Sequence, residues 1–135
     1  MREQFHSGSP YEQAYGFSRA VRVGDRVLVA GTAPIPPEGE AVAETAFEQM
    51  LRCGAIIIAS LEAAGARAVD VVRTRMFLTD AGDADEVGRA HAELFGGAAP
   101  AATMVVVGAL LDPAWKVEVE AEAQLPGDRQ IGTGS

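Results

Sequence analysis

Residues 100–123, PAATMVVVGALLDPAWKVEVEAEA, contain two stretches with the pattern of β-strands, joined by a turn that holds a proline. Residues 103–110 are almost wholly apolar and rich in valine, which is typical of a strand covered on both faces. The second stretch alternates, because successive strand side chains point to opposite faces. One face carries apolar residues and the other carries Glu118, Glu120 and Glu122. These carboxylates form either a solvated face or the wall of a polar cavity.

The composition indicates one compact domain with an aliphatic core. The chain has 135 residues, 48% of them hydrophobic and only 6% aromatic. Its net charge is −8, and Lys116 is its only lysine. An acidic chain without a basic run repels phosphate backbones, so we expect neither nucleic acid nor an anionic membrane surface as a partner.

Cysteine and hydropathy patterns favour a cytoplasmic protein. The single cysteine, Cys53, excludes an intrachain disulfide and fits a reducing compartment. Residues 1–10 have no apolar core of a signal peptide, and no stretch approaches about 18 uncharged apolar residues. Two distant histidines and one cysteine do not indicate a zinc site.

Turn residues divide the chain into an arm, a domain and a tail. Residues 1–13 are polar and include Gly8 and Pro10, so we expect a flexible N-terminal arm. Residues 14–124 form the domain, and the Gly-rich residues 125–135 form a flexible tail. Within the domain, strand-like residues 17–23 and 26–33 flank Gly24-Asp25, which is a hairpin signal.

Two helices and a further strand are expected downstream. Apolar residues at three-and-four spacing predict a helix over 42–64, with Gly65 at its C-terminal end and Cys53 packed inside it rather than acting as a nucleophile. Residues 71–78 form a strand with Arg73, Arg75 and Phe77 on one face, and with Val72, Thr74, Met76 and Leu78 turned toward the helices.

The second helix begins after Asp83 and ends at Gly96-Gly97. Asp83 followed by Glu86 matches a capping box, and the inner face would carry Val87, His91, Leu94 and Phe95. We interpret His91 as a packed helix residue rather than a catalyst.

The element order is β-β-α-β-α-β-β, an α+β domain whose two helices cover one face of a mixed sheet. The other face then carries Arg73, Arg75, Phe77 and acids of the last strand. This mixture of apolar and charged residues favours cover by another subunit.

Three segments resemble the reactive-intermediate deaminase (Rid, YjgF-type) family. They are VGDRVLVAGTAP at residues 23–34, DVVRTRMFLTD at residues 70–80, and PAATMVVV followed by KVEVEAEA within residues 100–123. The resemblance covers residues 17–123 and implies a chorismate-mutase-like fold. It also implies a barrel-like homotrimer with small-molecule clefts between subunits.

The resemblance implies a cofactor-free enzyme that hydrolyses imine or enamine forms of amino acids. The family's acid of the last strand is retained as Glu118 and its glycine as Gly31, and Thr103 supplies a hydroxyl. The family's arginine, which holds the substrate carboxylate, falls on Ala102, and alanine has no charge or donors for that role.

Four more family positions depart from the pattern: the tyrosine falls on Phe17, the serine on Ala30, the asparagine on Gly88 and the cysteine on Met104. Ordinary 2-aminoacrylate deamination is therefore not expected of this chain. Arg19, Arg73 and Arg75 are alternatives for a relocated anion anchor, against ordinary ion pairing with the acids of the last strand.

Two functions follow from these residues. The first is an enzyme that hydrolyses or tautomerises a reactive imine or enamine, with Glu118 as acid or base and backbone amides near Gly31 and Thr103 at the polar end. The second is a non-catalytic trimer that binds a small metabolite or a partner enzyme. Ribonuclease, a label attached to some relatives, ranks last because the chain is acidic.

Overall fold

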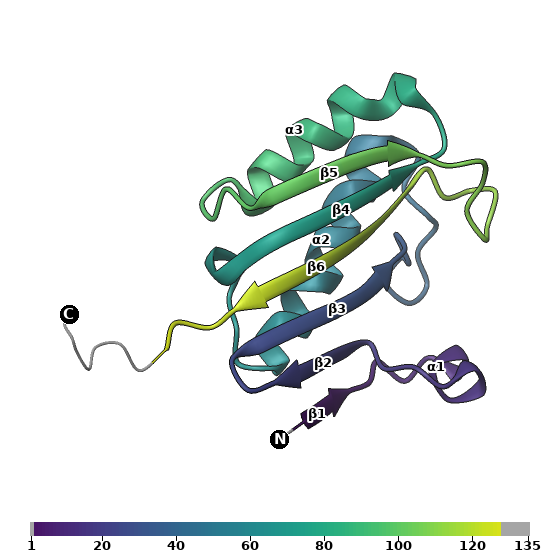
Figure 1. Ribbon diagram of the computed structural model, residues 1–135. Helices are drawn as coiled ribbons and strands as arrows, with labels where there is room; N and C mark the ends of the chain where they lie inside the picture. The colour runs from purple at the N-terminus through teal and green to yellow at the C-terminus, as the bar shows by residue number, and fades with distance from the viewer. Residues whose placement is uncertain (1, 128–135) are drawn as a thin grey trace.

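A computed structural model describes residues 2–127, which form a six-stranded sheet with two long helices on one face (Figure 1). The sheet order is β1-β2-β3-β6-β4-β5. All neighbouring strands are antiparallel except β4 and β5, which are parallel. The elements are β1 Arg2–Phe5, α1 Pro10–Tyr15, β2 Ala20–Val23, β3 Arg26–Thr32, α2 Ala46–Ala63, β4 Val71–Leu78, α3 Ala84–Phe95, β5 Ala101–Val106 and β6 Val117–Gln124.

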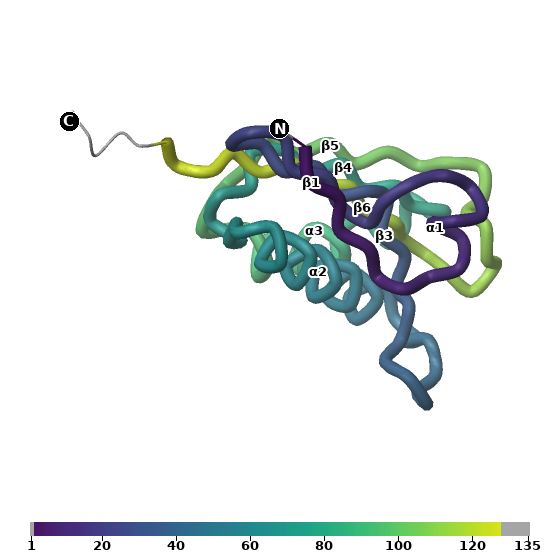
Figure 2. Tube along the Cα trace, turned by 90° about the horizontal axis from the view of Figure 1, so that it is seen from below, coloured from purple at the N-terminus to yellow at the C-terminus, as the bar shows by residue number. Residues whose placement is uncertain are grey.

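The predicted fold class is confirmed. A view turned by 90° shows α2 and α3 in one layer below the sheet, so that no helix of residues 2–127 covers the opposite sheet face (Figure 2). The predicted order of strands and helices corresponds to β2 through β6. The hairpin prediction is also confirmed, because Val23 pairs with Arg26 across the Gly24-Asp25 turn. Gly24 has φ +60°, a left-handed conformation that glycine adopts without strain.

The N-terminal segment departs from the prediction. We expected an arm without regular structure over residues 1–13, but β1 pairs with β2 and α1 follows it. Ser9 caps α1, with its side chain accepting a hydrogen bond from the Tyr11 amide, and Pro10 is the first residue of the helix. Of the predicted tail, residues 125–127 follow β6 without regular structure, and residues 128–135 lie outside the described residues.

A side-chain capping contact sets the beginning of α2 but not that of α3. The Thr45 hydroxyl accepts from the Glu48 amide, so α2 begins at Ala46 rather than at residue 42. The predicted capping box of α3 is wrong, since Asp83 makes no side-chain capping bond. Instead, Glu86 accepts a hydrogen bond of 3.1 Å from the Phe47 amide, and so satisfies a free donor in the first turn of α2.

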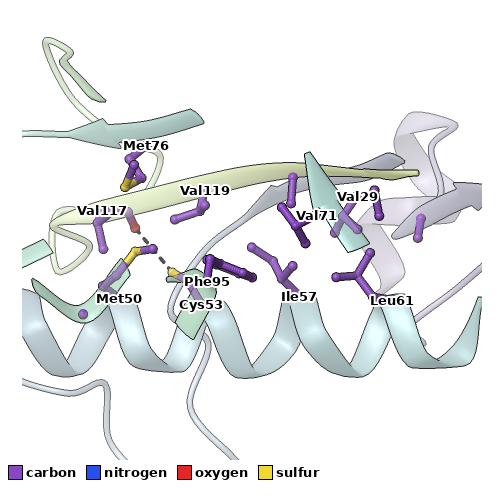
Figure 3. Packing of buried hydrophobic residues seen from close by; sticks show 14 of the residues in the cluster. Val29, Met50, Cys53, Ile57, Leu61, Val71, Met76, Phe95, Val117 and Val119 are labelled. Atoms are coloured by element: carbon purple, nitrogen blue, oxygen red, sulfur yellow. Dashed lines mark hydrogen bonds between the residues drawn. The ribbon is translucent and has the colours of Figure 1, made fainter. Parts of the chain in front are cut away.

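The core lies between α2 and the central strands. Met50, Cys53, Ile57 and Leu61 point from one side of α2 toward the sheet, where β6 contributes Val117 and Val119 (Figure 3). All of these side chains are fully buried. Burial raises the pKa of the Cys53 thiol to about 12, which keeps it protonated and agrees with a packing role.

Two strand predictions need correction. The two strands predicted within residues 100–123 form as β5 and β6, but they are not neighbours in the sheet, because β4 lies between them. The strand β5 is therefore an edge strand and largely exposed in the single chain, rather than covered on both faces. A register shift between Val71 and Arg73 turns Val71 inward and leaves Val72 42% exposed, although we predicted Val72 on the helix side.

None of the helices in the described residues is long and apolar enough to cross a membrane.

The three consecutive isoleucines of α2 give a test of this packing. Ile57 is fully buried against the sheet, whereas Ile56 is only partly buried. We expect Ile57→Ala to lower the free energy of unfolding by about 2 to 5 kcal/mol, because it leaves a cavity in the core. The matched Ile56→Ala variant should lose clearly less free energy of unfolding, as measured by urea denaturation. Equal losses in the two variants would contradict the orientation of α2.

Candidate functional site

Glu118 lies on the sheet face opposite the helices. It follows the buried Val117 on β6, and its partner on the neighbouring strand β4 is Phe77. Its carboxylate is half-buried, and among residues 2–127 it has no hydrogen bond or direct ion pair with another side chain. Burial raises the pKa of Glu118, and the nearby charge of Arg19 only partly opposes this rise. Glu118 is thus a carboxyl that folding makes easier to protonate.

Gly31 on β3 provides room for that carboxylate. The pairing of β3 with β6 is irregular between Val29 and Thr32, which places Gly31 against β6. A Cβ atom on Gly31 would lie 2.6 Å from Glu118 Oε2. Since that is closer than two such atoms can approach, Glu118 can take this position only beside a glycine.

Arg19 contacts the same glycine through its backbone carbonyl. Its Nη2 donates a hydrogen bond of 2.5 Å to the Gly31 carbonyl. Its Nε is sealed from solvent and has no hydrogen-bond partner in the described part of the chain. Burial lowers the pKa of Arg19, while the charges of Glu12 and Glu118 act to raise it. Arg19 and Glu118 are therefore electrostatically coupled, and both lie next to Gly31.

Glu12 is a buried acid that the sequence analysis missed. It lies in α1 and is only 3% exposed. Its carboxylate accepts hydrogen bonds from the Ser7 amide, at 3.1 Å, and from the Ser7 hydroxyl. It also lies 3.0 Å from His6 Nδ1. Burial raises the pKa of Glu12, but these hydrogen bonds and the Arg19 charge outweigh it and the net direction is down. The Ser9-Pro10 pair was the one local signal of this helix.

The other acids of β6 are ion-paired. Arg75 Nη1 lies 3.4 Å from Glu120 and 3.3 Å from Glu122, and Arg26 Nη2 lies 2.7 Å from Glu122. Glu120 and Glu122 thus belong to a surface network of charges. The sequence left two alternatives for the three acids of β6, a solvated face or the wall of a polar cavity. Glu120 and Glu122 fit the first alternative, whereas Glu118 has no direct ionic partner among residues 2–127.

The remaining predicted site residues are spread over β5, α3 and the segment before β2. Ala102, Thr103 and Met104 lie on β5, and two strand spacings place this strand about 10 Å from β6. Gly88 on α3 faces Met104, since a Cβ atom on it would lie 3.9 Å from Met104 Cε. Phe17 is 40% exposed. Within one chain, only Arg19 and Gly31 come together with Glu118.

The surface of residues 2–127 includes the following two hollows. One, of about 450 Å³, lies on the open sheet face and includes Phe17, Arg75 and Glu120 in its lining. The other, of about 310 Å³, lies between residues 5–7 and α2 and includes Arg19. Glu118 lines neither of these two hollows.

His91 belongs to the packing between α3 and the sheet. Its Nε2 lies 2.8 Å from the hydroxyl of the buried Thr74, and its ring packs against Phe95. Burial lowers the pKa of His91, which favours the neutral ring. The contacts agree with a packed helix histidine.

Comparison with known proteins gives the family. The family model described as Endoribonuclease L-PSP matches residues 9–125, which is most of the chain. The chain belongs to the YjgF/Rid family. The predicted recognition and fold are thereby confirmed.

Relatives of this YjgF/Rid protein cover nearly its whole length. It is 39% identical over 117 residues to the uncharacterized protein SCO2049 of Streptomyces coelicolor, covering 87% of each chain. It is 32% identical over 110 residues to the 2-iminobutanoate/2-iminopropanoate deaminase of Salmonella typhimurium, covering 79% of this chain and 85% of that one. The crystal structure of Rv2704 from Mycobacterium tuberculosis, a member of the YjgF/YER057c/UK114 family, matches with a TM-score of 0.85 and 41% identity, covering 93% of this chain and all of that chain.

The raised pKa of Glu118 predicts a pH-dependent effect on stability. A carboxyl whose pKa is raised by folding binds its proton more tightly in the folded chain. Wild-type stability should therefore fall as the pH rises from the ordinary value of 4.5 through the folded-state pKa. Glu118→Gln cannot ionise and escapes this loss, so its melting temperature relative to wild type should be higher at pH 7 than at pH 4. A variant that is less stable than wild type at pH 7 would instead indicate a structural ion pair.

Proposed function

We propose that this YjgF/Rid protein is an enzyme that hydrolyses or tautomerises a small imine or enamine, with Glu118 as the general acid and base. The observation that carries the proposal is the half-buried Glu118 carboxylate, which has a raised pKa and no direct ionic partner and lies against Gly31. Shifts of this kind bring a carboxyl closer to the operating pH and are frequent at catalytic sites.

The chemistry needs only one group that can take and return a proton. Ionised Glu118 removes a proton from water while the water oxygen adds to the imine carbon. The protonated carboxyl then returns this proton to nitrogen, which gives a carbinolamine. The same carboxylate next carries the hydroxyl proton of the carbinolamine to nitrogen, the carbon–nitrogen bond breaks, and a carbonyl compound and ammonia leave. In tautomerisation the same carboxylate moves a proton from carbon to nitrogen or back. Neither reaction requires a metal or an organic cofactor.

The other groups of the site have supporting roles. Arg19 holds the Gly31 carbonyl by its Nη2 and supplies a positive charge near Glu118. Backbone amides near Gly31 and Thr103 would bind the polar end of the substrate. The name of the Salmonella relative, a 2-iminobutanoate/2-iminopropanoate deaminase, supports imine chemistry as the reaction class.

Glu118→Gln tests the catalytic role. The change keeps the shape of the side chain but removes its proton transfer, so turnover of the natural-type imine should fall by roughly a hundredfold to ten-thousandfold. Glu122→Gln is a matched control, because Glu122 lies on the same strand and is paired with Arg26 and Arg75. Ammonia release measured on both variants should separate them.

Unchanged turnover in a folded Glu118→Gln protein would remove Glu118 from the mechanism. No turnover by the wild type would favour the second function, a non-catalytic protein that binds a small metabolite or a partner enzyme. The substitutions at Phe17, Gly88 and Met104 favour that alternative, because they replace polar residues of the family pattern with apolar ones or glycine.

Gly31→Ala provides an independent test of the same geometry. The new methyl group would lie 2.6 Å from Glu118 Oε2 and displace the carboxylate. Since a misplacement of about 1 Å can cost roughly a hundredfold in rate, we expect a large loss of turnover. The melting temperature should change little, because the displaced atoms are at the end of a flexible side chain. Retained turnover would contradict the role of this contact.

We propose that the protein is a homotrimer with the ligand clefts between subunits. The open sheet face exposes Leu28 by 43%, and the β5 edge exposes Val105 and Val106 by 42% and 56%. Apolar groups on a sheet edge are usually covered in solution. Light scattering should give three times the chain mass of 14.1 kDa, and a monomer at micromolar concentration would contradict the proposal.

A further inference from the structure

We propose that the hollow between residues 5–7 and α2 is a second small-molecule site, which binds a monocarboxylate with a short apolar body. The hollow has a volume of about 310 Å³, at the lower end of the range of ligand pockets, and Glu118 is not among its lining residues. Binding there is separate from the enzyme proposed above and does not depend on imine turnover.

The hollow lies on the helix side of the sheet, at its β1 edge. In Figure 1, α3 lies at the β5 side of the sheet and α2 behind its middle, whereas β1 forms the opposite edge. Phe5 lines the hollow and pairs across the strands with Ala20, whose side chain is buried in the core, so Phe5 also faces the helix side. The proposed subunit contacts use the open sheet face and the β5 edge. The hollow therefore does not need a second subunit, and a homotrimer of that kind leaves it accessible.

One wall of the hollow is apolar. Ala55, Ile56, Ala59 and Ala63 of α2 line it, and the three alanines recur every four residues along one side of the helix. From Ala55 to Ala63 the helix rises about 12 Å, which gives room for a chain of about six carbons with its head group. Small side chains along this wall can cover the methylene groups of such a ligand.

The charged part of the lining is cationic although the chain is acidic. The net charge is −8, yet the lining residues include Arg19, Arg52 and His6 and neither an aspartate nor a glutamate. His6 already contacts the Glu12 carboxylate. Within residues 2–127, neither arginine forms a direct ion pair. A carboxylate in the hollow supplies a counter-charge to these two groups.

Both arginines retain donors for a ligand. Arg19 donates one hydrogen bond from Nη2 to the Gly31 carbonyl, which leaves its Nη1 and the second Nη2 hydrogen. Arg52 donates from Nε to the Ile35 carbonyl, which leaves both of its Nη atoms. The paired Nη atoms of a guanidinium group match the two oxygens of a carboxylate. Together with the apolar wall, these donors favour a monocarboxylate over a compact inorganic anion.

Arg19 connects the hollow with Glu118. It belongs to the lining and donates to the Gly31 carbonyl, and Glu118 lies against Gly31. The charged groups that act on Glu118 are Arg19 and Glu120. An anion beside Arg19 offsets part of the positive charge at Glu118 and makes that carboxyl easier to protonate. By linkage, protonation of Glu118 strengthens anion binding in the hollow to the same extent.

Hexanoate is the probe for this site, with hexan-1-ol and acetate as controls. Amide NMR titrations of the full-length wild-type protein report where each compound binds and how tightly. We expect hexanoate to shift the amides of residues 5–7 and 55–60 until they saturate. Hexan-1-ol lacks the charge and acetate lacks the apolar body, so each should bind at least about tenfold more weakly.

Three results of these titrations would overturn the proposal. The first is the absence of saturable hexanoate binding, and the second is equal binding of hexanoate and one of the controls. The third is a set of shifts confined to the open sheet face around Gly31 and Glu118, which would place the anion in the cleft of the proposed enzyme.

Two variants test the cationic and apolar parts of the hollow separately. Arg52→Gln should weaken hexanoate binding by about tenfold or more. Arg89→Gln removes an equal charge from α3, outside the hollow, where Arg89 pairs with Asp85, and it should leave binding unchanged. Ala59→Glu places a carboxylate in the apolar wall and should abolish binding, while this exposed helix position tolerates glutamate at little cost in stability. Equal weakening by Arg52→Gln and Arg89→Gln, or tight binding to Ala59→Glu, would contradict the site.

Titration of Glu118 with hexanoate present tests the connection through Arg19. Carbon-13 NMR of the glutamate carboxyls should give a higher midpoint for Glu118 at saturating hexanoate than without it. The Ala59→Glu protein is the control, and hexanoate should not change its midpoint. An unchanged midpoint in wild-type protein with hexanoate in the hollow would overturn the connection. None of these measurements uses an imine, so failure of this site and failure of the enzyme proposal are distinguishable.

Discussion

The alternation of side chains along β6 is the constraint on which the fold and the site both depend. Val117, Val119, Ala121 and Ala123 are buried on one face, where the first two contact the apolar side of α2. Because strand side chains alternate, the same burial fixes Glu118, Glu120 and Glu122 on the opposite face. A shift by one residue would place carboxylates in the core, so the position of Glu118 is specified by the hydrophobic packing beneath it.

The three acids of β6 differ because their neighbours differ. Arg75 and Arg26 neutralise Glu120 and Glu122 by direct ion pairs. Glu118 faces Gly31, whose lack of a side chain admits the carboxylate but offers it no countercharge. Arg19 influences Glu118 through space while its Nη2 is occupied by the Gly31 carbonyl. Burial without a direct partner raises the pKa of Glu118, and the proposed proton transfer depends on this property.

Local sequence patterns predicted the parts of the molecule that depend on neighbouring residues. Gly24-Asp25 identified the first hairpin, three-and-four spacing identified α2, and period-two alternation identified Glu118. The insertion of β6 between β3 and β4 depends on contacts between distant segments, so residues 100–123 indicated two strands but not that β4 lies between them. The register shift that exposes Val72 depends on pairing with β6 in the same way.

The site was predictable only in part. Glu118, Gly31 and Arg19 were each identified from the sequence, but nothing local indicated that Arg19 donates to the Gly31 carbonyl. Glu12 was missed because its burial depends on the turn of Ser7 back onto its carboxylate. Ala102 indicated that the family's carboxylate-binding arginine is missing. Whether Arg73, Arg75 or Arg19 takes its place depends on distances that only the folded chain fixes.

Direct titration of the Glu118 carboxyl tests the central claim, which is that folding leaves this group half-buried without a direct ionic partner. Carbon-13 NMR of protein labelled at the glutamate carboxyls, with Glu118→Gln as the assignment control, reports its midpoint. The account predicts a midpoint above the ordinary value of 4.5 for Glu118 and, in the same spectra, one below 4.5 for Glu12. A Glu118 midpoint at or below 4.5 would mean that a cation pairs with it directly, and would contradict the account.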